Sequence, residues 1–256
     1  MARKLFLMIA ATLVVACSAP HNAYAFHPLI TDDTGTQGKG KFQLEINGQY
    51  GHDKDHGVVQ NTTPTATALT YGLTDTVDVA VGVPYTFLET RDTEGTVRHD
   101  GFGDAGVSGK WRFYEHGGLS LALKPSLTFP AGDEDEQMGT GRMTYSLFLI
   151  ATKEARPWAF HFNAGYIGNE NKLEQRVPLW HFSLAGEVEV AKGLKLAANT
   201  GIQRNVEKGT HTDPAFLLGG VVYSITERID LDAGYKYGLT RPEVNHTGLA
   251  GITIKF

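Results

Sequence analysis

Residues 41–50 read KFQLEINGQY, and this stretch decides how the rest of the chain is interpreted. Every second residue is apolar: Phe42, Leu44, Ile46 and Tyr50. The residues between them are polar: Gln43, Glu45, Asn47 and Gln49. Successive side chains of a β-strand point to opposite faces, so the stretch predicts a strand with one apolar and one wet face.

The same alternation recurs along the chain. It is clear in residues 77–87, 104–113, 119–129, 158–166, 180–190, 229–237 and 246–256, and less regular at about 62–73, 142–153, 194–204 and 214–225. After residue 25, no window longer than a turn has helical spacing. The sequence therefore predicts an all-β protein of about twelve strands.

The connections between these strands alternate in length. The short ones are LTDT, EHGG, KEARP, AKG and TERI, and the long polar ones are GHDKDHGVVQN, ETRDTEGTVRHD, AGDEDEQMGTG, GNENKLEQRV, NVEKGTHTD and LTRPEVNH. Alternating short turns and long loops are typical of an antiparallel transmembrane β-barrel of the Gram-negative outer-membrane type. An even number of strands places both ends on the short-turn side, which is periplasmic in such barrels.

A secreted β-sandwich is the alternative fold, because its sheets also have one apolar face. Nothing in a sandwich requires all long loops to lie at one end and all short turns at the other. Aromatic residues also gather at the ends of the apolar faces, as the interfacial girdles of a barrel require. These residues are Tyr50, Tyr85, Phe87, Trp111, Phe113, Phe129, Trp158 and Tyr166.

Composition excludes several other classes. Charged residues make up 20% of the chain and the formal net charge is −5. No basic run or aromatic-basic stripe points to nucleic acid. Cys17 is the only cysteine, so a disulfide scaffold and a cysteine metal site are excluded.

The first residues predict export. Residues 1–25 combine a basic start, a short apolar run and the small residues AYA, which is the pattern of a signal peptide cleaved after Ala25. An uncleaved anchor and a lipoprotein site at Cys17 are the alternatives. Residues 26–38 are polar and glycine-rich, and we expect them to form a periplasmic or plug segment in which Asp32 and Asp33 could meet Lys110 or Arg112. A disordered leader is the alternative. Residues 39–256 form the barrel.

Three stretches carry a family resemblance: HPLITDDTGTQGKGKFQLE, YGLTDTVDVAVGVPY and GFGDAGVSGKWRFYE with the following LSLALKPSLTFPAGD. With them, nearly all of the chain after residue 25 resembles the meta-pathway phenol-degradation (MetA-type) outer-membrane family. The resemblance implies an outer-membrane β-barrel that passes aromatic or other small hydrophobic compounds. It brings no catalytic motif.

The wet faces supply the candidate lumen-lining residues. They are Glu45, Asp104, Lys110, Arg112, Lys124, His161, Glu187, Glu189, Lys195, Asp230, Asp232 and Lys236, with Lys255 at the end of the chain. Inward charges of both signs require water or an opposite charge. His181 and Ser183 resemble part of a lipase site, but the flanking Trp180 and Phe182 turn both into the lumen. We expect no enzyme, no metal site and no cofactor.

The closing run GLAGITIKF alternates to its end, as expected of a strand that closes a barrel in lipid. Ile252, Ile254 and Phe256 resemble the signal read by the barrel-assembly machinery. The expected location is the outer membrane, with its lipid and lipopolysaccharide as partners. The expected function is passive passage of a small solute, aromatic or hydrophobic solutes among them. The alternative is a non-transporting structural or adhesive barrel.

Overall fold

The computed structural model describes residues 27–55 and 57–256, so the expected signal peptide lies outside the described residues. Thirteen strands cover most of this part of the chain. They are β1 (Phe42–Asp55), β2 (Val58–Gly72), β3 (Val77–Arg91), β4 (Thr96–Phe102), β5 (Ala105–His116), β6 (Leu119–Phe129), β7 (Thr144–Ala155), β8 (Trp158–Gly168), β9 (Pro178–Ala191), β10 (Leu194–Gln203), β11 (Ala215–Ser224), β12 (Ile229–Gly238) and β13 (His246–Lys255). Within residues 27–55 and 57–256, no helix is long and apolar enough to cross a membrane.

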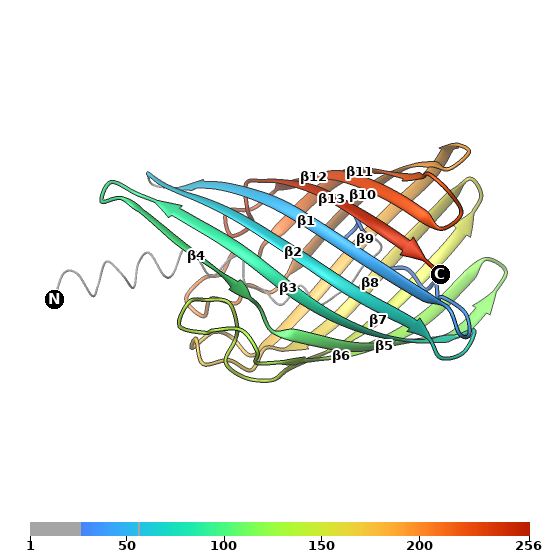
Figure 1. Ribbon diagram of the computed structural model, residues 1–256, viewed down its shortest axis with the longest axis horizontal. Helices are drawn as coiled ribbons and strands as arrows, with labels where there is room; N and C mark the ends of the chain where they lie inside the picture. The colour runs from blue at the N-terminus through green and yellow to red at the C-terminus, as the bar shows by residue number, and fades with distance from the viewer. Residues whose placement is uncertain (1–26, 56) are drawn as a thin grey trace.

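All strands belong to one antiparallel sheet that closes on itself. Each strand pairs with its neighbours in the chain except β4 and β5, which both pair with β3, and β1 pairs with β13 from Gln43↔Lys255 to His52↔His246. Figure 1 shows β1 in blue beside β13 in red at this seam. A closed sheet leaves no unpaired edge in lipid.

Two of the thirteen strands share one position in the barrel wall. The first part of β3, Val77–Gly82, pairs with β5, and its second part, Tyr85–Arg91, pairs with β4. β4 and β5 are therefore one wall strand interrupted at Gly103 and Asp104. Twelve wall positions result, which confirms the predicted twelve-stranded closed antiparallel barrel.

The first two long connections differ from the prediction. Residues 51–61 and 89–100 were expected to be loops, but β1 and β2 pair as far as Asp55↔Val58, and β3 and β4 as far as Arg91↔Thr96. Figure 1 shows both hairpins projecting from one end of the barrel. Where water reaches both faces of a hairpin, neither face needs apolar residues. The alternation that reveals a strand then disappears while the backbone pairing continues.

Apolar side chains lie mostly on the outer face of the barrel and polar ones mostly inside, which is the reverse of a soluble protein. Most large apolar residues on the outer face are well exposed, among them Val81 at 52%, Leu147 at 49% and Phe182 at 45%. Many buried residues are polar, with Asp32 and Asn163 at 2% or less. An apolar outer band and a polar interior are what a barrel in a lipid bilayer requires.

The aromatic residues expected at the strand ends lie on the outer face. Seven of them are strongly exposed: Tyr50, Phe87, Trp111, Phe113, Phe129, Trp158 and Tyr166. Tyr85 is partly covered, since its ring contacts those of Phe87 and Phe102 edge-on.

Phe256 lies at the seam where the barrel closes. Its amide donates to the Phe42 carbonyl at 3.0 Å, and the Phe42 amide donates back at 2.7 Å. The two rings stack with centroids 5.8 Å apart. Ile252 and Ile254 alternate on β13 with the buried Thr253, so they share the outward face with Phe256.

Deletion of Phe256 should lower the yield of assembled barrel more than it alters conductance. The deletion removes the last pair of hydrogen bonds at the seam and one aromatic contact, each of which contributes about 1 kcal/mol. The measurement is the heat-modifiable fraction on a denaturing gel, with Phe256→Tyr as the control that keeps the ring. A normal yield of the deletion variant would count against a role of this residue in assembly.

Candidate functional site in the barrel interior

The interior holds most of the charged residues that the alternation places on the wet face. Seven of the candidates are buried: Glu45, Asp104, Lys124, His161, Asp230, Asp232 and Lys236. Four are partly buried, namely Lys110, Arg112, Glu187 and Lys195, whereas Glu189 is exposed. Most of them contact another polar group of the protein. The interior is therefore lined by charges that are largely paired, as the mixed signs require.

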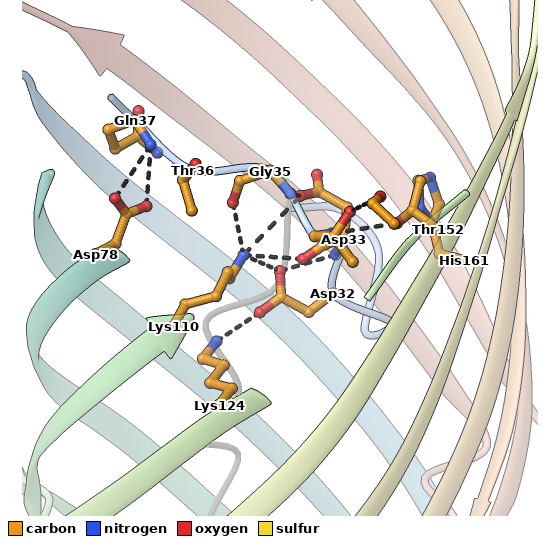
Figure 2. A network of polar contacts seen from close by, with 12 residues as sticks. Asp32, Asp33, Gly35, Thr36, Gln37, Asp78, Lys110, Lys124, Thr152 and His161 are labelled. Carbon is orange, nitrogen blue, oxygen red and sulfur yellow. Dashed lines mark hydrogen bonds and ion pairs between the residues drawn. The ribbon is translucent and has the colours of Figure 1, made fainter. Parts of the chain in front are cut away.

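Residues 27–38, hereafter the inner segment, lie inside the barrel and contact its wall on several strands (Figure 2). Backbone amides of the inner segment donate to Asn199 on β10 at 2.7 Å, to Thr152 on β7 at 3.1 Å and to Asp78 on β3 at 3.0 Å. Because these strands lie on different sides of the barrel, the inner segment runs around the inner wall.

The most buried charged anchor of the inner segment is Asp32, which is 2% exposed. One oxygen accepts from the Lys110 ammonium at 2.8 Å and the other from the Lys124 ammonium at 2.7 Å. Lys110 also donates to the carbonyl oxygens of Asp33 and Gly35. Figure 2 shows the two lysines reaching from neighbouring strands to one carboxylate.

The charges around Asp32 keep it ionised. Burial alone would raise the pKa of this carboxyl, but Lys110 and Lys124 outweigh burial and hold its pKa below the ordinary value of 3.8. The carboxylate then bridges two buried or partly buried cations. Asp32, Lys110 and Lys124 form a buried triad of charges, and breaking it is costly in free energy because it is buried.

Arg112 is not part of this triad. It lies near the short-turn end, where it donates to the Asp75 carbonyl at 3.0 Å and forms an ion pair with Glu115 at 3.2 Å. The Asp33 carboxylate lies 3.9 Å from Lys110 Nζ, so it is only a distant ionic partner of this lysine. Of the pairings considered from the sequence, only Asp32 with Lys110 is close.

The other charged candidates form local pairs. Lys195 donates to Glu187 at 2.8 Å, and Lys255 donates to Asp230 at 2.6 Å. Asp232 pairs with His27 of the inner segment. These pairs tie adjacent strands to one another or to the inner segment.

Two cavities flank the inner segment. One, of about 220 Å³, lies toward the short-turn end and is lined by Asp32 and Lys110 among others. The other, of about 330 Å³, lies toward the long loops, and His27 and Pro28 form part of its lining. Different residues of the inner segment line the two cavities, so it lies between them. The inner segment is thus placed to restrict the lumen.

Asp104 fastens a long loop over the second cavity. One carboxylate oxygen accepts from the Gly132 amide at 3.0 Å, and the other from the amide and the hydroxyl of Thr140, both at 2.8 Å. Met138 of the same loop is 8% exposed and lines this cavity. Asp104 therefore holds the β6–β7 loop inward in addition to lining the lumen.

Asp104→Ala should release this loop. Three hydrogen bonds to a buried carboxylate are lost, and the Gly132 and Thr140 amides lose their acceptor. Trypsin should then cut after Arg142 several-fold faster in the folded, reconstituted protein, whereas Asp100→Ala should leave the rate unchanged. Equal rates in all three proteins would show that the loop is held by other contacts.

His181 and Ser183 do not form a hydrolytic pair. Ser183 Oγ is buried and has no hydrogen-bond partner among the described residues, so no base is placed to take its proton. His181 Nδ1 instead lies 3.3 Å from Gln203 Oε1. Among residues 27–55 and 57–256, no group of three His, Cys, Asp or Glu side chains could hold a metal ion.

Several anchors of the inner segment were missed in the sequence. Asn199, Thr152 and Asp78 all occupy wet-face positions of regular strands. Two of them are uncharged, and the sequence argument gave weight to charge alone. Polar residues of any kind at wet-face positions would have been the better signal.

A family model matches residues 26–256, and its description is "Putative MetA-pathway of phenol degradation". The chain belongs to this family. The match covers all of the barrel and the inner segment, and it confirms the resemblance seen in the sequence. No curated protein sequence matches the chain.

Solved structures with the same fold are outer-membrane barrels. The COG4313 outer membrane channel from Pseudomonas putida F1 has a TM-score of 0.69 at 14% identity, covering 88% of this chain and 98% of that one. The NanC porin has a TM-score of 0.58 at 12% identity, with coverage of 83% and 100%. The β domain of the Bordetella autotransporter BrkA has a TM-score of 0.55 at 12% identity, with coverage of 84% and 98%. At these identities the likeness establishes the fold alone.

Proposed function

We propose that this protein is a passive outer-membrane channel for small solutes, aromatic and hydrophobic ones among them. One observation carries the proposal: the closed barrel contains two cavities with the inner segment between them. A barrel that served only as a scaffold would not need a cavity on each side of the inner segment. The inner segment then sets how much of the lumen is open.

A barrel of twelve strands has a lumen of intermediate width. Barrels of about eight strands fill with side chains, and those of about sixteen leave an aqueous channel. The ion pairs and the inner segment narrow this lumen further. A narrow route favours small molecules over the larger solutes that pass wide porins.

The apolar outer band and the aromatic side chains at its edges support a place in the outer membrane, among its lipids and lipopolysaccharide. The seam with Phe256 supports delivery by the barrel-assembly machinery. We further propose that the protein is not an enzyme. Within residues 27–55 and 57–256, Ser183, the one serine that resembled a nucleophile, is not hydrogen-bonded to a base.

Liposome swelling and planar-bilayer recording test the channel function. The refolded barrel should pass ions and small solutes, and empty liposomes prepared in the same way are the control. A barrel that folds in lipid but passes neither ions nor solutes, even without its inner segment, would favour the alternative role in adhesion or envelope structure.

A further inference from the structure

The cavity at the short-turn end, hereafter the short-turn cavity, has more carboxylates than ammonium groups in its lining. Its charged residues are Asp32, Asp33, Glu45 and Asp78 on the one hand, and Lys110, Lys124 and Lys255 on the other. Lys110 and Lys124 share the single carboxylate of Asp32. Lys255 is paired with Asp230, which lies outside the lining. The three lysines therefore bring no ion pair to Glu45 or Asp78.

Glu45 and Asp78 are both deeply buried, at 5% and 3% exposure. Glu45 Oε1 accepts a hydrogen bond from the side-chain amide of Gln43 at 2.6 Å. The Asp78 carboxylate accepts from the Gln37 backbone amide at 3.0 and 3.2 Å, as Figure 2 shows. Both donors are neutral, and within residues 27–55 and 57–256 no cationic side chain forms an ion pair with either carboxylate. Buried carboxylates are normally balanced by a cation, so here the missing charge has to come from the solution.

Small side chains keep space open beside Glu45. Cross-strand pairing runs from Gln43 on β1 to Thr70 on β2, from Thr70 to Ala80 on β3, and from Ala80 to Ser108 on β5. Thr70, Ala80 and Ser108 all line the short-turn cavity. They separate the acidic wall at β1 from the lysines of β5 and β6, which Asp32 holds. The volume of about 220 Å³ is therefore available to mobile ions and water.

The cavity toward the long loops has the same sign of charge. With histidines neutral, its charged lining consists of Asp104, Glu243 and Lys236. Lys236 is paired with Glu243 at 2.6 Å, so it leaves no unbalanced positive charge. An ion that crosses the barrel thus meets an excess of carboxylates in both cavities.

From this charge distribution we propose that the channel is selective for cations over anions, and that Glu45 and Asp78 set this preference in the short-turn cavity. Carboxylates in a narrow, low-dielectric passage raise the local concentration of cations and repel anions. The proposal rests on the channel function and names the charge class of the ions that pass. Potassium and chloride are the probes, because they differ in sign and are similar in mobility.

The test is the reversal potential of the refolded protein in a planar bilayer with a potassium chloride gradient, at about pH 8, where carboxylates are ordinarily ionised. Potassium should be at least about threefold more permeant than chloride. Glu45→Gln and Asp78→Asn should each lower this permeability ratio about twofold to fivefold. Both changes keep the shape and an oxygen that accepts the hydrogen bond from Gln43 or Gln37. Glu94→Gln is the matched control, since Glu94 is exposed in the turn of the projecting β3–β4 hairpin, and it should leave the ratio unchanged.

A variant of the opposite sign separates an effect of charge from one of altered structure. Lys255→Gln removes a positive charge from the lining of the short-turn cavity and frees the charge of Asp230, so it should raise the ratio of potassium to chloride permeability. A general loosening of the barrel would lower the selectivity in all three lumen variants. Heat-modifiable migration checks that each variant is folded.

The proposal is overturned if chloride permeates as well as potassium or better, or if Glu45→Gln and Asp78→Asn leave the permeability ratio unchanged. Either result would leave the channel function standing, because current flows in both cases. A folded barrel that carries no current, even without its inner segment, would overturn the channel function and the selectivity together.

Discussion

Deletion of residues 26–38 should raise the single-channel conductance several-fold. The inner segment lies between the two cavities and is fixed to the wall from β3 to β12. The strands of the barrel pair with one another and not with the inner segment, so the closed sheet remains. Without the inner segment the two cavities join. The measurement is planar-bilayer recording of the refolded variant beside the intact protein.

A deletion of residues 92–95, the turn between β3 and β4, is the matched control. This turn lies at the far end of the projecting hairpin, away from the lumen. It should leave conductance unchanged. Unchanged conductance after deletion of the inner segment would show that the barrier to ions lies elsewhere, for example in the inward-held β6–β7 loop.

Asp32→Ala should have the second largest effect. The change leaves Lys110 and Lys124 buried without the carboxylate that both contact. Removing one partner of a buried ion pair costs about 3–5 kcal/mol. The inner segment would then leave its seat much of the time, and the current should show frequent large openings. Single-channel recording measures the open fraction.

Asp33→Ala is the control for this variant, since Asp33 lies 3.9 Å from Lys110 and is more exposed. Its open fraction should match that of the intact protein. Equal behaviour of the two variants would mean that the triad does not hold the inner segment in place.

The pH dependence of channel opening should also depend on the ion pairs of Asp32. The pKa of Asp32 is lowered inside the barrel. Its contribution to holding the inner segment in place is therefore present above the ordinary pKa of 3.8, and it is lost as the pH falls through the lowered pKa. Loss of the Asp32 carboxylate charge should therefore increase the openings of the intact protein at strongly acidic pH. Bilayer recording at stepped pH measures this.

The barrel could be predicted from the sequence because lipid imposes a rule on every second residue. The stretch from Phe42 to Tyr50 already shows it, and the alternating short and long connections give the topology. Lipid does not reach the projecting ends of β1 to β4, so no alternation marked them. The interruption at Gly103 and Asp104 left no periodic signal either, because it depends on the loop that Asp104 holds.

The interior was only partly predictable. Alternation shows that Lys110 and Asp232 face inward, but it cannot show which charges meet across the lumen. The pairing of Asp32 with both Lys110 and Lys124 depends on the path of the inner segment, which has no periodicity. Lys236 was expected among the lumen charges, yet its partner Glu243 comes from a loop whose inward fold the sequence does not reveal.

The most direct test of the channel and its barrier is to lock the inner segment in place. The hydroxyl oxygens of Thr34 and Ser120 lie 2.5 Å apart, close to the length of a disulfide bond of about 2.0 Å. Cys17 is the only cysteine and lies in the expected signal peptide, so a Thr34→Cys, Ser120→Cys pair would have no competing thiol. Liposome swelling with a small solute should be slow while the disulfide is formed and should recover on reduction. Equal swelling before and after reduction would contradict the claim that the inner segment controls passage.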